Sequence, residues 1–309
     1  MSKKSKKSLN RLFSEEKGQS LVLVAIFLVA LLGISAFVVD AGYLFFQKRH
    51  LQNTADAAAL AGVRELVDGD ANSISSVVVD YIEAHGLSSS DITNMPEIQS
   101  INSGDTEVPV ELQVTRGLFF ARVLGFQDSS VAARAMAATG PPANLKGLIP
   151  LGIPDEVYQA EHTFNIYTVD NNQIFGPGNW GFVDLDAHPG GGVPELEDYL
   201  INGYNDYIDI DDWILTETGN KANSSKIKNA VPLNQIVYVP IIDVSGKQMG
   251  VDPVQVKGFA ALVLTEIGST GPGTSGDMYI IGEFVKNIAV GDIYPDGPDY
   301  GVKVIALVE

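Results

Sequence analysis

The feature that most constrains this chain is an uncharged stretch of twenty residues, 20–39. A helix rises about 1.5 Å per residue, so this stretch matches the roughly 30 Å hydrocarbon core of a bilayer. A lysine-rich leader precedes it, and no proline interrupts the segment that follows. The pattern predicts a transmembrane helix over residues 20–39. A cleaved signal peptide is the competing interpretation, but its apolar region would span only about 7 to 15 residues.

The distribution of charge predicts the orientation of this helix. Residues 1–19 carry six basic and two acidic side chains, whereas the rest of the chain carries 14 basic and 36 acidic ones. Short basic flanks stay in the cytoplasm during membrane insertion. We therefore expect a single-pass protein of the cell membrane with a cytoplasmic N-terminus and an extracytoplasmic bulk.

Composition limits the chemistry of the remaining chain. It contains no cysteine, which excludes disulfides, thiol nucleophiles and cysteine-ligated zinc. The formal net charge of −18 and the pI near 4.5 argue against a nucleic acid partner. The acidic exterior likewise argues against a second, electrostatic docking onto anionic lipid, so we expect the anchor alone to hold the protein at the membrane.

The helix is expected to continue well beyond the membrane. Residues 40–67 contain no proline and many good helix formers, so one helix is predicted from residue 19 to residue 67. Several residues recur at three- and four-residue steps and give a narrow face of small side chains, which lets another element approach closely. They are Leu51, Ala55, Ala58, Gly62 and Leu66.

Three motifs mark this helix. Gly18-Gln19 opens it, Asp40 and Gly42 follow the apolar stretch, and LQNTADAAALAG closes it over residues 51–62. In these motifs the segment resembles the N-terminal region of Tad-type (TadE/TadG-like, Flp pilus-assembly) proteins. The resemblance implies an assembly factor or minor structural component of a Tad-like pilus or secretion system, with pilins and secretion machinery proteins as partners. It implies no enzymatic activity.

The resemblance also implies which helix residues matter. They are Asp40, Gly42, Leu51, Ala55, Asp56, Ala58, Ala59 and Gly62. Two roles are open for this set: contact with another molecule, giving a homo- or hetero-oligomer through the helix, or docking of the helix on the protein's own sheet. Asp40 is expected at the outer membrane boundary, where an ion costs little only if it stays in the interface.

Processing of the leader is a separate question. Prepilins of the wider class are cut after a glycine and carry glutamate at the fifth mature position, whereas counting from Gly18 that position is Leu23. This departure favours an uncleaved Gly18, with a peptidase site as the alternative.

The exterior is predicted to be α+β, with a β-rich and mainly antiparallel remainder. The expected division is a cytoplasmic stub (1–19), the transmembrane helix (20–39), a pilin-like helix with a small antiparallel sheet (40–140) and a β-rich extracytoplasmic domain (141–309), because Gly140, Pro141 and Pro142 break the pattern. In the third segment we expect a helix over 74–85, strands over 97–101 and 107–115, a short helix over 118–124, and a strand or small-residue helix over 129–138.

The last segment is expected to consist of strands with one clear helix. The helix is predicted over residues 194–202, ending at Gly203. Strands are predicted over 164–169, 182–185, 213–217, 236–243, 254–267, 278–286 and 303–308.

No motif in the chain points to an enzyme, and we expect no catalytic residue, cofactor or metal. Two acidic clusters could in principle bind Ca²⁺: Asp206, Asp209, Asp211 and Asp212, and separately Asp292, Asp296 and Asp299. A solvated acidic surface is the favoured interpretation of both. Asp243-Val-Ser245 begins like a metal-dependent adhesion site, but Lys247 replaces the second hydroxyl, which favours a hairpin turn.

A second class of function is surface adhesion or ligand binding by the distal β-rich segment. Trp180 and Trp213 are its aromatic candidates. The favoured interpretation of both is that they are ordinary core tryptophans.

Overall fold

A computed structural model of the protein describes residues 6–68, 73–87, 107–160, 179–188, 192–218, 224–245, 251–269 and 278–308. The architecture is α+β, as predicted. The helices are α1 (Lys6–Asp68), α2 (Ile74–Ala84), α3 (Asp155–Ala160), α4 (Gly192–Asn202), α5 (Ser225–Ala230) and the 3-10 helix η1 (Ala121–Leu124). The strands are β1 (Glu107–Gly117), β2 (Asp128–Gly140), β3 (Asn144–Leu145), β4 (Ile153–Pro154), β5 (Asn179–Asp184), β6 (Ile208–Asp209), β7 (Trp213–Thr218), β8 (Ile236–Asp243), β9 (Pro253–Ser269), β10 (Met278–Val285), β11 (Asn287–Ala289) and β12 (Val302–Val308).

The described elements form two compact units. The first contains α1 up to Ala58, α2 from Val79 onward, and β1 and β2 between Pro109 and Ala135. The second contains the other described residues.

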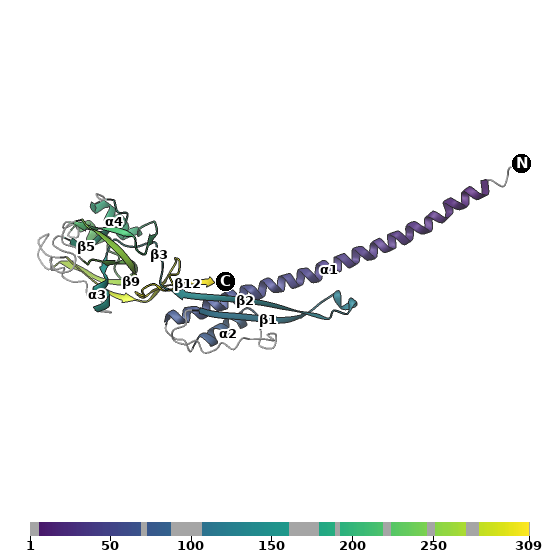
Figure 1. The fold of residues 1–309 in the computed structure, drawn as a ribbon, viewed down its shortest axis with the longest axis horizontal. Helices are drawn as coiled ribbons and strands as arrows, with labels where there is room; N and C mark the ends of the chain where they lie inside the picture. The colour runs from purple at the N-terminus through teal and green to yellow at the C-terminus, as the bar shows by residue number, and fades with distance from the viewer. Residues whose placement is uncertain are drawn as a thin grey trace. The chain divides into compact units, whose positions relative to one another are not determined.

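Helix α1 is continuous, as Figure 1 shows. It confirms the predicted helix and begins before residue 19. Its apolar side chains over residues 21–39 are exposed, for example Phe27 (62%) and Leu32 (69%). Among the described residues, α1 is the one helix that is long enough and apolar enough to cross a membrane. A helix with this composition and exposure fits a single-pass membrane anchor.

Strands β1 and β2 are neighbours in one sheet, and their side chains alternate between buried and exposed. Val108, Val110, Leu112 and Val114 are at most 2% exposed, which confirms the predicted alternation in β1. The small-residue segment after residue 128 is a strand and not a helix. Every second side chain from Val131 to Ala137 is buried, so a period of two decides its structure.

The turn between β1 and β2 differs from the prediction in length. A short helix was expected over 118–124, but only Ala121–Leu124 forms a 3-10 helix. Phe119 and Phe120 lie in a bend before it, and Gly125 ends it with a left-handed φ of 96°. A residue with a Cβ rarely adopts this conformation, so the glycine limits the helix to four residues.

The four-stranded sheet has the order β1-β2-β12-β11. β12 pairs antiparallel with the end of β2, where Ala306 lies opposite Ala138, and β11 pairs parallel with β12. This confirms the predicted C-terminal strand. Two strands from the segment after residue 140, β12 and β11, therefore belong to the same sheet as β1 and β2. The predicted division of the chain at residue 140 stays a prediction.

The larger sheet has the order β4-β8-β9-β7-β5, and β10 also pairs with β9. Its pairings are antiparallel except that of β4 with β8. The predicted strands over 182–185, 213–217, 236–243, 254–267 and 278–286 are confirmed within it. Those over 97–101 and 164–169 lie outside the described residues.

Strand β9 supplies the core on both of its faces. Leu262 and Leu264 belong to one buried cluster, which Leu196 and Leu200 of α4 and Ile227 of α5 also join. Phe259 and Ala261 belong to a second cluster. This two-sided burial explains why the central part of β9, residues 258–264, is apolar without interruption.

The predicted end of α4 is also confirmed. Gly203 follows the helix with a φ of 73°, and a Cβ at this position would lie 2.9 Å from the Cα of Gly147. Both conformation and close approach require glycine here.

Candidate functional site

The predicted packing face of α1 is buried within the protein. Leu51, Ala55, Ala58 and Ala59 are at most 1% exposed, and Gly62 is buried as well. Their spacing of three and four residues places them on one side of the helix. The face is therefore used inside the chain's own fold, whereas its contact with other molecules stays a prediction.

Polar side chains of α1 also bind the backbone of β2. Lys48 Nζ donates to the carbonyl oxygen of Ala132, and Gln52 Nε2 donates to the carbonyl oxygen of Arg134 at 2.7 Å. The same amide nitrogen donates to Asp56 Oδ1 at 2.9 Å. Asp56, one of the predicted helix residues, thus orients the glutamine that links α1 to the hairpin.

The two predicted glycines of α1 have opposite surroundings. A Cβ on Gly62 would lie 2.8 Å from Val78 Cγ2 and 3.0 Å from Val108 Cγ1, so close packing requires a glycine there. Gly42 is exposed, and a Cβ on it would meet no atom within 4 Å. Close packing inside the fold therefore explains why residue 62 is a glycine, but it does not explain the glycine at position 42.

Asp40 is 5% exposed and binds the tip of the β1–β2 hairpin. Its Oδ1 accepts from the backbone N–H of Phe119 at 2.8 Å. Its Oδ2 accepts from the N–H groups of Phe120 at 3.0 Å and Ala121 at 2.7 Å. The carboxylate of α1 thereby satisfies the amides at the start of η1, which the helix itself cannot pair.

The hydrogen bonds decide the ionisation state of Asp40. Burial opposes the charged form, but the N–H groups of Ala121, Phe119 and Phe120 and the charge of Arg122 together hold the pKa of Asp40 below its usual value. The carboxylate is therefore charged at neutral pH. Sequence reasoning placed Asp40 at the membrane boundary but could not find these partners, which follow it by 79 to 81 residues.

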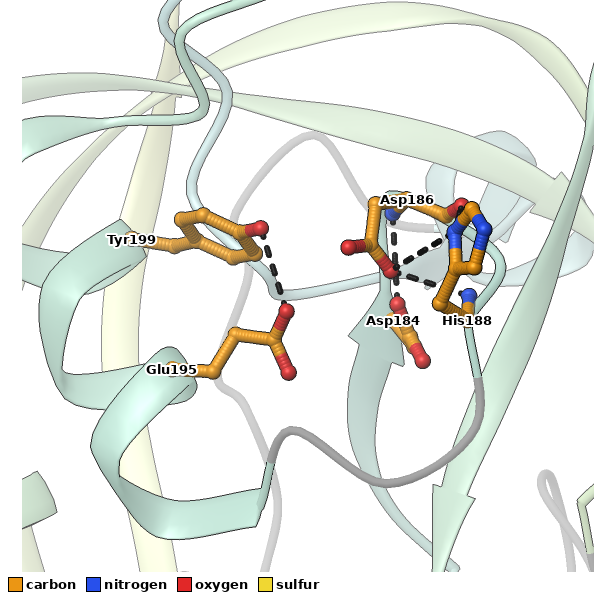
Figure 2. A network of polar contacts seen from close by, with 5 residues as sticks. All are labelled: Asp184, Asp186, His188, Glu195 and Tyr199. Carbon is orange, nitrogen blue, oxygen red and sulfur yellow. Dashed lines mark hydrogen bonds and ion pairs between the residues drawn. The ribbon is translucent and has the colours of Figure 1, made fainter.

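A second group of interest contains three carboxylates that the sequence analysis did not single out. Asp184 ends β5, Asp186 follows two residues later, and Glu195 lies in the first turn of α4, as Figure 2 shows. Their nearest oxygen atoms all lie within 4.8 Å of one another. In this network Asp186 N donates to Asp184 Oδ1 at 3.2 Å, and the Tyr199 hydroxyl donates to Glu195 Oε1 at 3.2 Å.

Close approach of the carboxylates separates their pKa values. Burial, followed by the hydrogen bond and the charge of Asp186, raises the pKa of Asp184 to about 7. For Asp186, burial is outweighed by hydrogen bonds from Asp184 and from the N–H of His188, which lower its pKa. Asp184 therefore takes up a proton below about pH 7, while the lowered pKa of Asp186 favours its charged form. Three carboxylates could also contribute to a cation site, although Ca²⁺ takes six to eight oxygens.

The acidic clusters predicted from the sequence are arranged differently. Among the described residues, neither one brings three carboxylates within ligand distance. In the first cluster Asp212 Oδ2 accepts from the N–H of Asp209 at 2.9 Å. In the second, Asp299 Oδ2 pairs with Lys303 Nζ at 2.8 Å.

The Asp243 segment makes a local turn contact. The N–H of Ser245 donates to Asp243 Oδ1 at 2.9 Å, and Lys257 Nζ lies 3.9 Å from Asp243 Oδ2. One oxygen of the Asp243 carboxylate therefore stabilises the turn, and the ammonium group of Lys257 lies near the other oxygen. Lys247 lies outside the described residues.

The prediction of a core tryptophan is wrong for Trp213, which is 58% exposed. It begins β7, and the alternation of that strand buries the next residue, Ile214, in its place. The side chain of Trp180 lies outside the described residues.

Comparison with known proteins identifies one segment. A protein-family model described as "Putative Flp pilus-assembly TadE/G-like" matches residues 18–65. The N-terminal helix region is TadE/G-like. The match confirms the resemblance seen in the three motifs and covers the apolar stretch, Asp40 and the small-residue face of α1. No curated protein and no solved structure gives a significant match to the chain.

Proposed function

We propose that the protein is a membrane-anchored assembly factor or minor structural component of a Tad-like (Flp) pilus or secretion system. The observation that carries this proposal is the TadE/G-like match over residues 18–65, which coincides with the exposed apolar part of α1 and its docked continuation. Pilins and secretion machinery proteins are the proposed partners, and the role is not enzymatic.

The proposed orientation places the N-terminus in the cytoplasm and the β-rich segment outside the membrane. The net positive charge of residues 1–19 supports it, because short basic flanks remain cytoplasmic. The acidic remainder follows the span as one long segment, and such segments translocate largely regardless of charge.

The exposed side of α1 is the proposed contact with partners. The small residues Ala55, Ala58 and Ala59 are buried by the chain's own fold, whereas other positions of α1 remain exposed. Gly42 belongs to the family motif, is exposed and has no close neighbour. A partner helix approaching closely at Gly42 would give this glycine a role.

Counting surface pili on cells that lack the gene tests the proposed function. We expect loss of pili, restoration by the wild-type chain and by Asn53→Leu, and poor restoration by Gly42→Leu. Asn53 is the matched control because it is an exposed residue of the same helix. Normal pilus numbers without the gene would overturn the proposal.

Surface binding by the distal segment is the second candidate function. The exposure of Trp213 favours it, because tryptophan, with an apolar ring and a polar N–H, is enriched at interaction surfaces. Loss of surface attachment by Trp213→Ala cells that keep normal pili would support this role. Unchanged attachment would exclude Trp213 as its binding residue.

A further inference from the structure

The tip of the β1–β2 hairpin exposes an unusual amount of apolar surface. Within residues 118–127, five large apolar side chains are between 48% and 87% exposed: Phe119, Phe120, Val123, Leu124 and Phe126. Isolated exposed apolar residues are common, but a contiguous group of this kind marks a surface that contacts something apolar.

The contact with Asp40 fixes this tip beside the end of the membrane span. Asp40 is the first residue after the uncharged stretch 20–39, whose length matches the hydrocarbon core. Phe119, Phe120 and Ala121 are bound directly to its carboxylate. Tyr43, one helical turn farther along α1, also packs edge-on against Phe119 with ring centroids 5.2 Å apart. The tip therefore lies at the depth of the bilayer surface whenever α1 spans.

The charge of the tip suits a lipid surface. The chain as a whole has a formal net charge of −18, yet residues 118–127 contain no acidic side chain and one basic one, Arg122. Apolar side chains with a neighbouring cation are the composition of segments that lie in the membrane interface. An acidic tip would instead be repelled by anionic headgroups.

We propose that the hairpin tip, residues 118–127, is a second membrane contact that inserts its apolar side chains into the lipid interface beside α1. The proposal rests on the membrane anchoring in the proposed function and is independent of the pilus role and of which side of the membrane the tip faces. It gives the buried carboxylate of Asp40 a role, because this residue connects the transmembrane helix to the interfacial tip. Two attachment points would restrict tilting of the exterior about the anchor.

A lipid occupant is favoured over a second copy of the chain by the position of the tip. The bilayer is present at this depth in every molecule that uses the anchor, whereas a protein partner would have to be recruited there. The apolar residues also lie on a short turn and not on a flat sheet face, which suits shallow insertion into lipid.

Site-specific fluorescence on the full chain in lipid vesicles tests this proposal. The chain has no cysteine, so one environment-sensitive dye can be placed at Val123→Cys, at Phe27→Cys in the span, or at Val290→Cys, which is exposed in the distal segment. The vesicles contain phosphatidylethanolamine and phosphatidylglycerol, with or without lipids that carry a nitroxide quencher near the headgroup, to report on the tip, or along the acyl chain, to report on the span. We expect a blue-shifted emission and strong lipid quenching at Val123, quenching at Phe27, and neither effect at Val290.

A charge substitution distinguishes insertion from mere proximity. Leu124→Asp adds an acidic group at a side chain that is 79% exposed, so the fold itself should tolerate it. We expect it to abolish quenching at Val123 while quenching at Phe27 remains. Val290→Asp, at an equally exposed distal position, is the control and should leave quenching at Val123 unchanged.

The possible failures can be told apart. Quenching at Phe27 without quenching at Val123 overturns the interfacial tip and leaves the anchor intact. Absence of quenching at both positions removes the anchor and with it the membrane part of the proposed function. A blue shift at Val123 that depends on protein density and not on the lipid quencher shows that another copy covers the tip, which also overturns the proposal.

Discussion

Single residues of this protein carry roles that depend on partners distant in sequence. Asp40 could be placed at the membrane boundary from its position after residue 39, and the small residues after it could be assigned to one helix face. The hydrogen bonds that Asp40 accepts could not be predicted, because their donors follow it by 79 to 81 residues. The same holds for Asp184 and Glu195, which only the fold brings together.

Removing the Asp40 carboxylate should release the hairpin tip. In Asp40→Ala we expect faster hydrogen exchange at the amides of Phe119, Phe120 and Ala121, because these donors lose their acceptor. Mass spectrometry of the full chain in detergent measures it. Asp56→Ala, which removes another carboxylate of α1, should leave these amides protected, and equal protection in both variants would contradict the assignment.

Acidic pH should release the hairpin tip as the substitution Asp40→Ala does. The pKa of Asp40 is lower in the folded chain than in the unfolded one, so its contribution to stability is complete above the usual aspartate pKa of about 3.9. That contribution is lost as the pH falls through the lowered pKa. Tip amides that remain equally protected at all acidic pH values would show that the charge of Asp40 is unimportant.

For the Asp184–Asp186 pair we expect a pH dependence of stability that is opposite to that of Asp40. Because the pKa of Asp184 rises to about 7 on folding, the folded chain binds more protons than the unfolded chain between about pH 4 and pH 7. The free energy of unfolding should therefore fall as the pH rises through this window, by on the order of 1 to 3 kcal/mol. Denaturant titration at several pH values measures this decrease.

Two substitutions test which group is responsible. Asp184→Asn should flatten the decrease, since an amide does not titrate, whereas Asp206→Asn in an exposed loop should keep it. A decrease that persists unchanged in Asp184→Asn would assign the effect to other groups.

At the level of elements, periodicity predicted most of the fold. The period of two in β1 and the apolar centre of β9 were sufficient to identify these strands, and the absence of proline identified α1. The 3-10 helix η1 is shorter than predicted because Gly125 ends it and the preceding bend is held by Asp40. The hydrogen bonds from the bend to Asp40 could not be predicted from the local sequence.

The glycines of α1 provide a matched pair of substitutions. Gly62→Ala should destabilise the fold by about 1 to 3 kcal/mol, because its new Cβ would press on Val78 and Val108. Gly42→Ala meets no neighbour and should be neutral or stabilise α1 by up to about 1 kcal/mol. Thermal unfolding of the full chain in detergent compares them. Equal effects of the two substitutions would show that close packing does not explain Gly62.

At the level of the whole molecule, the sequence predicted the class of protein better than its connectivity. The α+β class and the N-terminal TadE/G-like segment are confirmed, but the return of β12 to pair with β2 was not predicted. Such pairing joins residues more than 160 positions apart, as in Ala138 opposite Ala306. Neither strand carries a local signal that names its partner. The exposed apolar tip was missed for a related reason, since burial of its side chains depends on the tertiary fold.

In the proposed topology, one helix anchors the protein and places the β-rich segment outside the membrane. Labelling of Val290→Cys by a membrane-impermeant maleimide on intact, wall-stripped cells tests it most directly, because Val290 is 84% exposed and the wild-type chain has no cysteine. We expect membrane-bound protein to be labelled in intact cells to the same extent as after lysis. Labelling only after lysis, or recovery of the labelled chain as a soluble secreted protein, would contradict it.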